Sequence, residues 1–240
     1  MTSRKIAIQT QLWGNDNLEK DFEPIFNEVL QAGYDGVECR FTVLNQRDRL
    51  ESYLESRALT IVGVHASLGV FLDEGRPNDK FFELVQDMKR LNVRRLLLSG
   101  GKFAEYEPIY ALADECARHH IELLYHNHAY EFEHGYRMFD EIVKHPGVGL
   151  ALDIGWLYRA GVGLEPFLNR YGERIRYFHI KDTTRDQWKE LGTGDAGMRE
   201  AIRLIERIPM EWWTVEQDDS TLPALESATI SRTFLSELGY

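Results

Sequence analysis

Short apolar segments that end in a polar residue recur along this chain, and this recurrence limits the folds that it can adopt. The segment 148–152 runs into Asp153, and the segment 175–178 runs into His179. Between them, residues 165–171 have a helical pattern. Strand, helix and second strand form a βαβ unit of about thirty residues. Polar residues end the expected strands at intervals of about 30 residues: Glu38, His65, Ser99, His126, Asp153, His179 and Glu216.

Strand and helix patterns alternate through the whole chain. Strands are expected at 5–11, 36–40, 60–64, 93–98, 121–125, 148–152, 175–178 and 211–215. Helices are expected at 18–32, 43–57, 78–91, 105–119, 136–144, 165–171, 195–208 and 224–238. Such units close into a (β/α)8 barrel whose active site lies at the carboxyl ends of the strands. We therefore expect an α/β protein with residues 1–240 in a single (β/α)8 barrel domain.

The alternative fold is an open, doubly wound sheet. That fold would be favoured by a glycine-rich phosphate-binding fingerprint after the first strand. Residues 9–14 do not contain one. A glycine pair, Gly100 and Gly101, does follow the fourth strand; it offers either backbone donors to a phosphate or only a turn.

Composition narrows the class of partner. The net charge is −11, from 28 basic and 39 acidic residues, which disfavours nucleic acid and anionic membranes as partners. The cysteines, Cys39 and Cys116, have no CxxC spacing, and no apolar run is long enough for a signal core or a membrane span. We expect a cytoplasmic enzyme that acts on a small molecule. Monomer and homo-oligomer both stay open.

The polar strand ends suggest a metal site at one rim of the barrel. Asp153, His179 and Glu216 would supply carboxylate and imidazole ligands that suit Mn²⁺, Mg²⁺, Co²⁺ or Zn²⁺. The alternative is a hydrogen-bonded polar rim without a metal. Lys181 lies on the same face of its strand as His179. It would either bind a substrate oxygen or bridge to Asp153 or Glu216. Glu38 and Arg40 also share a face and could pair with each other.

Several of these segments resemble one known family. The matching pieces are Gly36-Val37-Glu38 with Arg40, Tyr125-His126-Asn127-His128 with Glu131-Phe132, Asp153-Ile154-Gly155-Trp156, His179-Ile180-Lys181-Asp182 and Val215-Glu216. In their order and spacing they resemble the xylose-isomerase-like TIM barrel superfamily of sugar phosphate isomerases and epimerases. Its members include ketose epimerases, inosose dehydratases, dehydroshikimate dehydratases, hydroxypyruvate isomerases and endonuclease IV.

The resemblance implies roles for individual residues. It makes Asp153, His179 and Glu216 metal ligands. Many relatives have a glutamate as fourth ligand at the end of the fifth strand, where this chain has His126. The resemblance therefore implies that His126 replaces that ligand or base, or that Glu131 folds back from the loop. Trp156 stands where ketose epimerases often have histidine, which suits stacking on a sugar ring or packing at the rim. Substrate-binding roles are expected for Glu38, Arg40, His65, His128, Trp156 and Lys181.

The expected chemistry is proton abstraction next to the carbonyl of a sugar, sugar phosphate or polyol. A divalent ion would polarise the carbonyl and hold the charge of an enediolate. Glu216, His126 or Glu131 would move the proton, with Lys181 as a further catalytic group. Return of the proton gives isomerisation or epimerisation, which we expect. Loss of a β-hydroxyl would instead give an inosose-dehydratase-like lyase that acts on a keto-polyol or 3-keto sugar.

Two other functional classes are weighed against this enzyme. DNA repair like that of endonuclease IV is disfavoured by the acidic charge and the absence of a basic face. A non-catalytic sugar-binding barrel would keep the fold but would show neither bound metal nor exchange of substrate protons with solvent.

Overall fold

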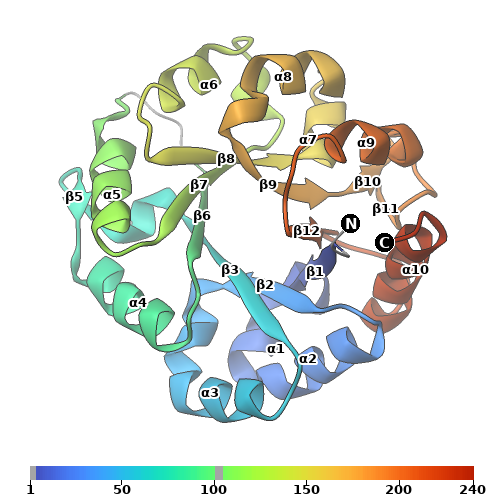
Figure 1. Ribbon diagram of the computed structural model, residues 1–240, viewed down its shortest axis with the longest axis horizontal. Coiled ribbons are helices and arrows are strands. Elements are labelled where there is room, and N and C mark those ends of the chain that lie inside the picture. The colour runs from blue at the N-terminus through green and yellow to red at the C-terminus, as the bar shows by residue number, and fades with distance from the viewer. Residues whose placement is uncertain (1–3, 101–104) are drawn as a thin grey trace.

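The computed structural model describes residues 4–100 and 105–240, so Gly101 lies outside the described residues. The described strands form a closed barrel of eight parallel strands (Figure 1). In spatial order they are β1 (Lys5–Gln9), β12 (Trp212–Val215), β9 (Ile175–Ile180), β8 (Val148–Asp153), β7 (Glu122–His126), β6 (Arg95–Ser99), β3 (Thr60–Ser67) and β2 (Gly36–Arg40). The predicted (β/α)8 barrel is confirmed, and the open-sheet alternative is wrong because β1 pairs with both β2 and β12.

Helices surround the barrel (Figure 1). They are α1 (Asn15–Lys20), α2 (Phe22–Gln31), α3 (Arg47–Glu55), α4 (Asp79–Arg90), α5 (Glu107–Arg118), α6 (Arg137–Ile142), α7 (Ile154–Arg159), α8 (Leu164–Tyr171), α9 (Met198–Ile205) and α10 (Ala224–Glu237). Two short hairpins, β4 (Leu72–Asp73) with β5 (Arg76–Pro77) and β10 (Asp182–Thr183) with β11 (Trp188–Lys189), extend the connecting loops.

Several helices differ from the predicted ranges. The helix expected at 18–32 is divided at Asp21, whose backbone is extended. Pro24 explains the division, because it has no N–H to donate to the carbonyl of Lys20 and a continuous helix would lose that bond. The helix expected at 43–57 begins only at Arg47, after the 3₁₀ turn η2 (Phe41–Gln46). Helix α7, which follows β8 directly, was not predicted from the sequence.

The interior of the barrel is filled by an apolar layer. Its members are Ala7, Val62, Leu97, Leu124, Ala151, Tyr177 and Trp212. Small residues make room for the larger ones: a Cβ on Gly149 would lie 2.7 Å from Leu124, and one on Gly63 would lie 2.8 Å from Leu97. The barrel is therefore a packed core, and the polar strand-end residues lie beyond this layer.

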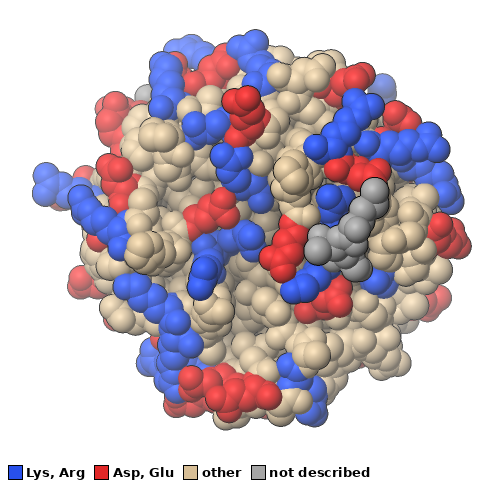
Figure 2. Space-filling view, in the orientation of Figure 1, with Lys and Arg blue, Asp and Glu red and all other residues tan. Residues whose placement is uncertain are grey.

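Charge is mixed over the surface. Figure 2 shows acidic and basic side chains interspersed on one face of the molecule. Among the described residues, no helix is both long and apolar enough to cross a membrane.

Candidate active site

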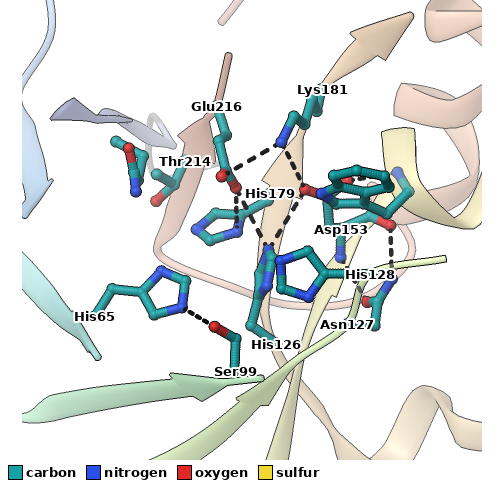
Figure 3. Close-up of polar contacts among 12 residues, drawn as sticks. His65, Ser99, His126, Asn127, His128, Asp153, His179, Lys181, Thr214 and Glu216 are labelled. Carbon is teal, nitrogen blue, oxygen red and sulfur yellow. Dashed lines mark hydrogen bonds and ion pairs between the residues drawn. The ribbon is translucent and has the colours of Figure 1, made fainter. Parts of the chain in front are cut away.

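Four residues from neighbouring strands converge at one end of the barrel (Figure 3). His126 ends β7, Asp153 ends β8, His179 belongs to β9, and Glu216 follows β12 directly. Each offers a nitrogen or carboxylate oxygen, and these four atoms all lie within 4.8 Å of one another. All four residues are buried. We call them the donor group.

The atoms of the donor group point at a common region without satisfying one another. Four of these atoms are buried and have no hydrogen-bond partner among the described residues: His126 Nε2, Asp153 Oδ2, His179 Nδ1 and Glu216 Oε2. His126 Nε2 lies 3.4 Å from Asp153 Oδ2 and 3.5 Å from Glu216 Oε2, close enough for ion pairs. His179 Nδ1 lies 2.6 Å from Glu216 Oε2, but the two are not aligned for a hydrogen bond. Buried polar atoms normally have partners. Two imidazole nitrogens and two carboxylate oxygens are a suitable set for a divalent cation, so these residues fit a metal.

The loop after β8 fixes Asp153 in place. Its Oδ1 accepts a hydrogen bond from the Trp156 backbone N–H at 2.8 Å and so caps α7, which leaves Oδ2 in the donor group. Asn127 supports the same residue: its Oδ1 accepts from the Asp153 N–H at 2.9 Å, and its Nδ2 donates to the Asp153 carbonyl at 3.3 Å. The carboxylate is therefore held before any ligand binds.

Glu38 lies directly against His179. Its Oε2 is 2.6 Å from His179 Nε2, and its Oε1 is 3.5 Å from His65 Nδ1. Burial disfavours the charged carboxylate, but the contacts with the two histidines outweigh it and lower the pKa of Glu38 to about 2. Burial disfavours the charged imidazolium of His179, but the carboxylates of Glu216 and Glu38 outweigh this effect and raise the pKa of His179 well above its ordinary value. A carboxylate in this position orients the other imidazole nitrogen toward the donor group.

Lys181 is fully buried beside the donor group. Its Nζ lies 3.5 Å from Asp153 Oδ2, 3.4 Å from Glu216 Oε1 and 2.8 Å from Asp218 Oδ2. Burial disfavours the ammonium, but these carboxylates outweigh it and raise the pKa of Lys181. The Trp188 ring covers the ammonium at 4.1 Å. The lysine therefore stays charged and brings a positive charge to the edge of the donor group.

Three residues around Lys181 were not assigned a role from the sequence. Asp218 is two positions after Glu216, and this period-two spacing could have indicated it. Asp182 accepts hydrogen bonds from the backbone N–H groups of Thr183, Gly192, Gly194 and Ala196, which fixes the loop that contains Trp188. No sequence pattern indicated Trp188, because its position depends on that loop.

His65 and Arg40 differ in their relation to the site. His65 Nε2 is 3.0 Å from Ser99 Oγ, and its ring lies 5.1 Å from that of His126. Burial lowers the pKa of His65. Arg40 ends its strand with an exposed side chain that pairs with Glu19 at 3.7 Å. The alternative in which Glu38 and Arg40 pair is wrong, since their side chains have other partners.

Glu131 belongs to the 3₁₀ turn η4 (Tyr130–Phe132) in the loop that follows β7. Its Oε1 accepts from Tyr125 OH at 2.9 Å and its Oε2 accepts from the His128 backbone N–H at 2.7 Å. Although burial opposes ionisation, hydrogen bonds from His128 and Tyr125 lower the pKa of Glu131. It is not in the donor group. His128 is closer to that group, with its ring 4.9 Å from His126 and 5.3 Å from Trp156.

Comparisons with known proteins agree with this architecture. The sequence is 22% identical over 229 residues to the inosose dehydratase of Mesomycoplasma hyopneumoniae, covering 83% of this chain and 76% of that protein. A sugar phosphate isomerase/epimerase from Parabacteroides distasonis superposes with a TM-score of 0.78 at 16% identity, covering 98% of this chain and 96% of that one. A probable 3-DHS dehydratase from Bacillus anthracis gives 0.74 at 15% identity, with 97% and 98% covered. Such structural matches show the fold.

The family itself is shown by a match along most of the sequence. The model of the xylose isomerase-like TIM barrel family matches residues 26–238. Its members include epimerases, isomerases and a dehydratase. The chain therefore belongs to the xylose isomerase-like TIM barrel family.

Proposed function

We propose that this protein is a divalent-metal-dependent enzyme that moves a proton next to the carbonyl of a sugar or polyol, so that the product is an isomer or epimer. One observation carries the proposal: four buried donor atoms from His126, Asp153, His179 and Glu216 lie within 4.8 Å of one another and have no hydrogen-bond partner among the described residues. The family contains enzymes for reactions of this kind.

The donor group would hold the metal through two nitrogens and two oxygens. Asp153 and Glu216 balance the charge of a divalent cation, while Glu38 fixes the orientation of His179. When bound, such an ion supplies Lewis acidity to the substrate carbonyl and its neighbouring hydroxyl. Mn²⁺, Mg²⁺, Co²⁺ and Zn²⁺ are all compatible with this mixture of imidazole and carboxylate.

Glu216 is the residue that we propose to move the proton. Its Oε2 lies 3.5 Å from His126 Nε2 and 2.6 Å from His179 Nδ1, and its Oε1 lies 3.4 Å from Lys181 Nζ. His126 is the second candidate because its Nε2 lies 3.4 Å from Asp153 Oδ2 and 3.5 Å from Glu216 Oε2. Lys181 would stabilise negative charge that develops on a substrate oxygen. The contacts of Glu131 with Tyr125 and His128 favour a role in holding the loop over a role in proton transfer.

Dehydration is the second candidate reaction. Proton removal next to a carbonyl is also the first step of β-elimination, and a β-hydroxyl would then leave as water after protonation. Two observations favour it. The curated relatives are inosose dehydratases. In addition, β7 ends at a histidine, whereas many relatives have at this position one of the two glutamates that exchange the substrate proton.

Solvent exchange tests both reactions. Keto-sugars and keto-inositols are incubated with the protein in D₂O with Mn²⁺ and followed by NMR. Deuterium should enter the carbon next to the carbonyl, with a new epimer or isomer as product; an α,β-unsaturated ketone would assign the protein to the lyases. Absence of exchange throughout the panel with metal-loaded protein would reject the proposed chemistry.

Matched variants test the donor group. Glu216→Gln should fold, lose the exchange and bind less metal, and Asp153→Asn should also bind less metal. Glu237→Gln is the control, because Glu237 is an exposed residue of α10 that pairs with Arg199. Metal content equal to that of the unchanged protein in both site variants would reject the metal site.

A further inference from the structure

A pocket lies beside the donor group at the same end of the barrel, and we call it the rim pocket. It has a volume of about 560 Å³. It lies between the loop after β7 and helix α7. Its main lining residues are His128, Tyr130, Phe132, Glu133, Trp156 and Arg159. Pockets that bind small molecules typically measure roughly 300–1,000 Å³, so the rim pocket is large enough for a sugar ring.

Two residues that line the rim pocket, His128 and Trp156, also lie next to the proposed reaction site. The His128 ring is 4.9 Å from that of His126 in the donor group. The Trp156 ring lies 5.3 Å from Lys181 Nζ, which contacts the other side of the group. The two wall rings also touch each other, with centroids 5.3 Å apart. A substrate whose carbonyl lies at the donor group would therefore extend over this wall into the rim pocket.

The lining combines flat rings with polar side chains. His128 and Tyr130 are stacked, with centroids 5.6 Å apart and planes 12° apart. His128 Nδ1 and Arg159 Nη2 are buried and have no hydrogen-bond partner among the described residues. The nearest carboxylate oxygen to His128 Nδ1, on Glu131, is 3.8 Å away and too far for one. Aromatic faces that stack on a ring, together with a guanidinium group in the same lining, suit a hydroxyl-bearing ring.

Arg159 is held in place before any ligand binds. Its Nε donates to Thr183 Oγ1 at 2.8 Å, and its guanidinium lies 3.4 Å from the centre of the Trp188 ring. Two contacts therefore fix the side chain. Orientation in advance reduces the entropy lost when a ligand binds.

The charge of the rim pocket favours a neutral ligand over a phosphate. Glu133 and Arg159 are its charged lining residues among those described, and their formal charges cancel. The positive charge of Arg159 is further opposed by four nearby carboxylates, those of Asp153, Asp186, Asp218 and Asp219. A phosphate here would meet one arginine in a negative field, whereas hydroxyl groups would meet no such repulsion.

We propose that the rim pocket binds a second, neutral sugar ring, so that the substrate is a saccharide of two linked rings in which one ring reacts at the donor group. This inference rests on the proposed function for the position of the reacting ring. It adds the size and charge class of the substrate: a disaccharide or glycoside, and neither a free monosaccharide nor a sugar phosphate.

Calorimetry on the Mn²⁺-loaded protein tests the binding site with stable probes. The probes are glucose, glucose 6-phosphate, cellobiose, maltose and trehalose. At least one disaccharide should bind about tenfold or more tightly than glucose, as expected for added ring contacts and hydrogen bonds. If no disaccharide exceeds glucose, or if glucose 6-phosphate binds more tightly than every disaccharide, the proposal is overturned.

Two variants link that preference to the rim pocket. Arg159→Gln and Tyr130→Leu should each reduce the ratio of disaccharide affinity to glucose affinity. Arg159→Gln should reduce it by about tenfold because it removes a charged group from the lining, and Tyr130→Leu removes a flat ring from it. Arg47→Gln is the control, since Arg47 lines a separate cavity beside α4. Thermal denaturation establishes that each variant is folded. An unchanged ratio in both folded variants would place the second ring elsewhere and overturn the proposal.

Deuterium exchange separates this inference from the proposed function. Exchange on keto-monosaccharides, together with no preference for disaccharides, would keep the reaction and reject the second-ring site. Tight disaccharide binding without exchange on any keto-saccharide would keep the site and reject the reaction.

Discussion

The two layers inside the barrel differ in how their polar atoms are satisfied, although the same strands build both. Strand β9 provides Tyr177 to the apolar layer and, two residues later, His179 to the donor group. In the apolar layer, Tyr177 OH accepts a hydrogen bond from Thr214 Oγ1 at 2.6 Å. At the rim, the donor atoms of His126, Asp153, His179 and Glu216 have no hydrogen-bond partner among the described residues. The hydroxyl in the apolar layer finds its partners within the protein, whereas the atoms of the donor group require a ligand from outside.

This difference implies that stability and function depend on different residues. Burial of apolar side chains stabilises the folded state, while unpaired buried polar atoms reduce its stability until a partner satisfies them. Changes in the apolar layer should therefore alter stability without altering metal binding. Changes at the rim should do the opposite.

Leu97→Ala should give the largest loss of stability. Leu97 is fully buried in the apolar layer, and removal of such a side chain leaves a cavity that costs about 2–5 kcal/mol. Urea denaturation followed by circular dichroism measures the change. Metal stoichiometry of the folded variant should equal that of the unchanged protein; loss of metal would mean that the two layers are not independent.

Metal should stabilise the unchanged protein and not the rim variants. A ligand that binds only the folded state at a hundred times its Kd adds about 2.7 kcal/mol. Urea denaturation with and without Mn²⁺ measures this gain. Asp153→Asn should abolish it while preserving α7, because asparagine also caps helices. An equal gain in the variant would show that the ion binds elsewhere.

Glu38→Gln should weaken metal binding by about 10- to 100-fold, as is typical when a group that orients a ligating histidine is changed. The reason is the 2.6 Å contact between Glu38 and His179 Nε2. Titration with Mn²⁺ measures the affinity. Glu131→Gln is the matched control because Glu131 contacts Tyr125 and His128. Equal losses in both variants would contradict the specific role of Glu38.

Thr214→Val should have the smallest effect. It removes the hydroxyl that donates to Tyr177 OH between the two layers, which should cost about 1 kcal/mol of stability. Valine has nearly the same shape, so the donor group above should be undisturbed and the Mn²⁺ affinity should not change. A clear change in affinity would indicate that this hydrogen bond also positions His179.

The barrel could be predicted from the sequence because the patterns that indicate its strands and helices are short and recur along the chain. Alternating strand and helix patterns are visible in short windows, and a parallel barrel places every strand end at one rim. The residues of the donor group were all among the candidates for that reason. Helix α7 was missed because it directly follows the strand and its pattern merges with the buried run before it.

The partners of the rim residues could not be predicted in the same way. Period two places Glu38 and Arg40 on one face of an ideal strand, but Arg40 ends β2 and its side chain pairs with Glu19 outside the barrel. Trp188 reaches Lys181 only because Asp182 fixes the intervening loop. Such contacts depend on loop geometry, which hydrophobic periodicity does not describe.

The pairing of β1 with β12 has a consequence for the order in which the protein folds. Lys5 and Glu211, joined by an ion pair, are 206 positions apart in the chain, and contacts of such large separation tend to slow folding. Glu216 follows β12 directly, so the donor group is complete only after the last barrel strand has docked. Uptake of Mn²⁺ during refolding should therefore follow the closure of the barrel in time, which makes the bound ion a kinetic reporter of that late step.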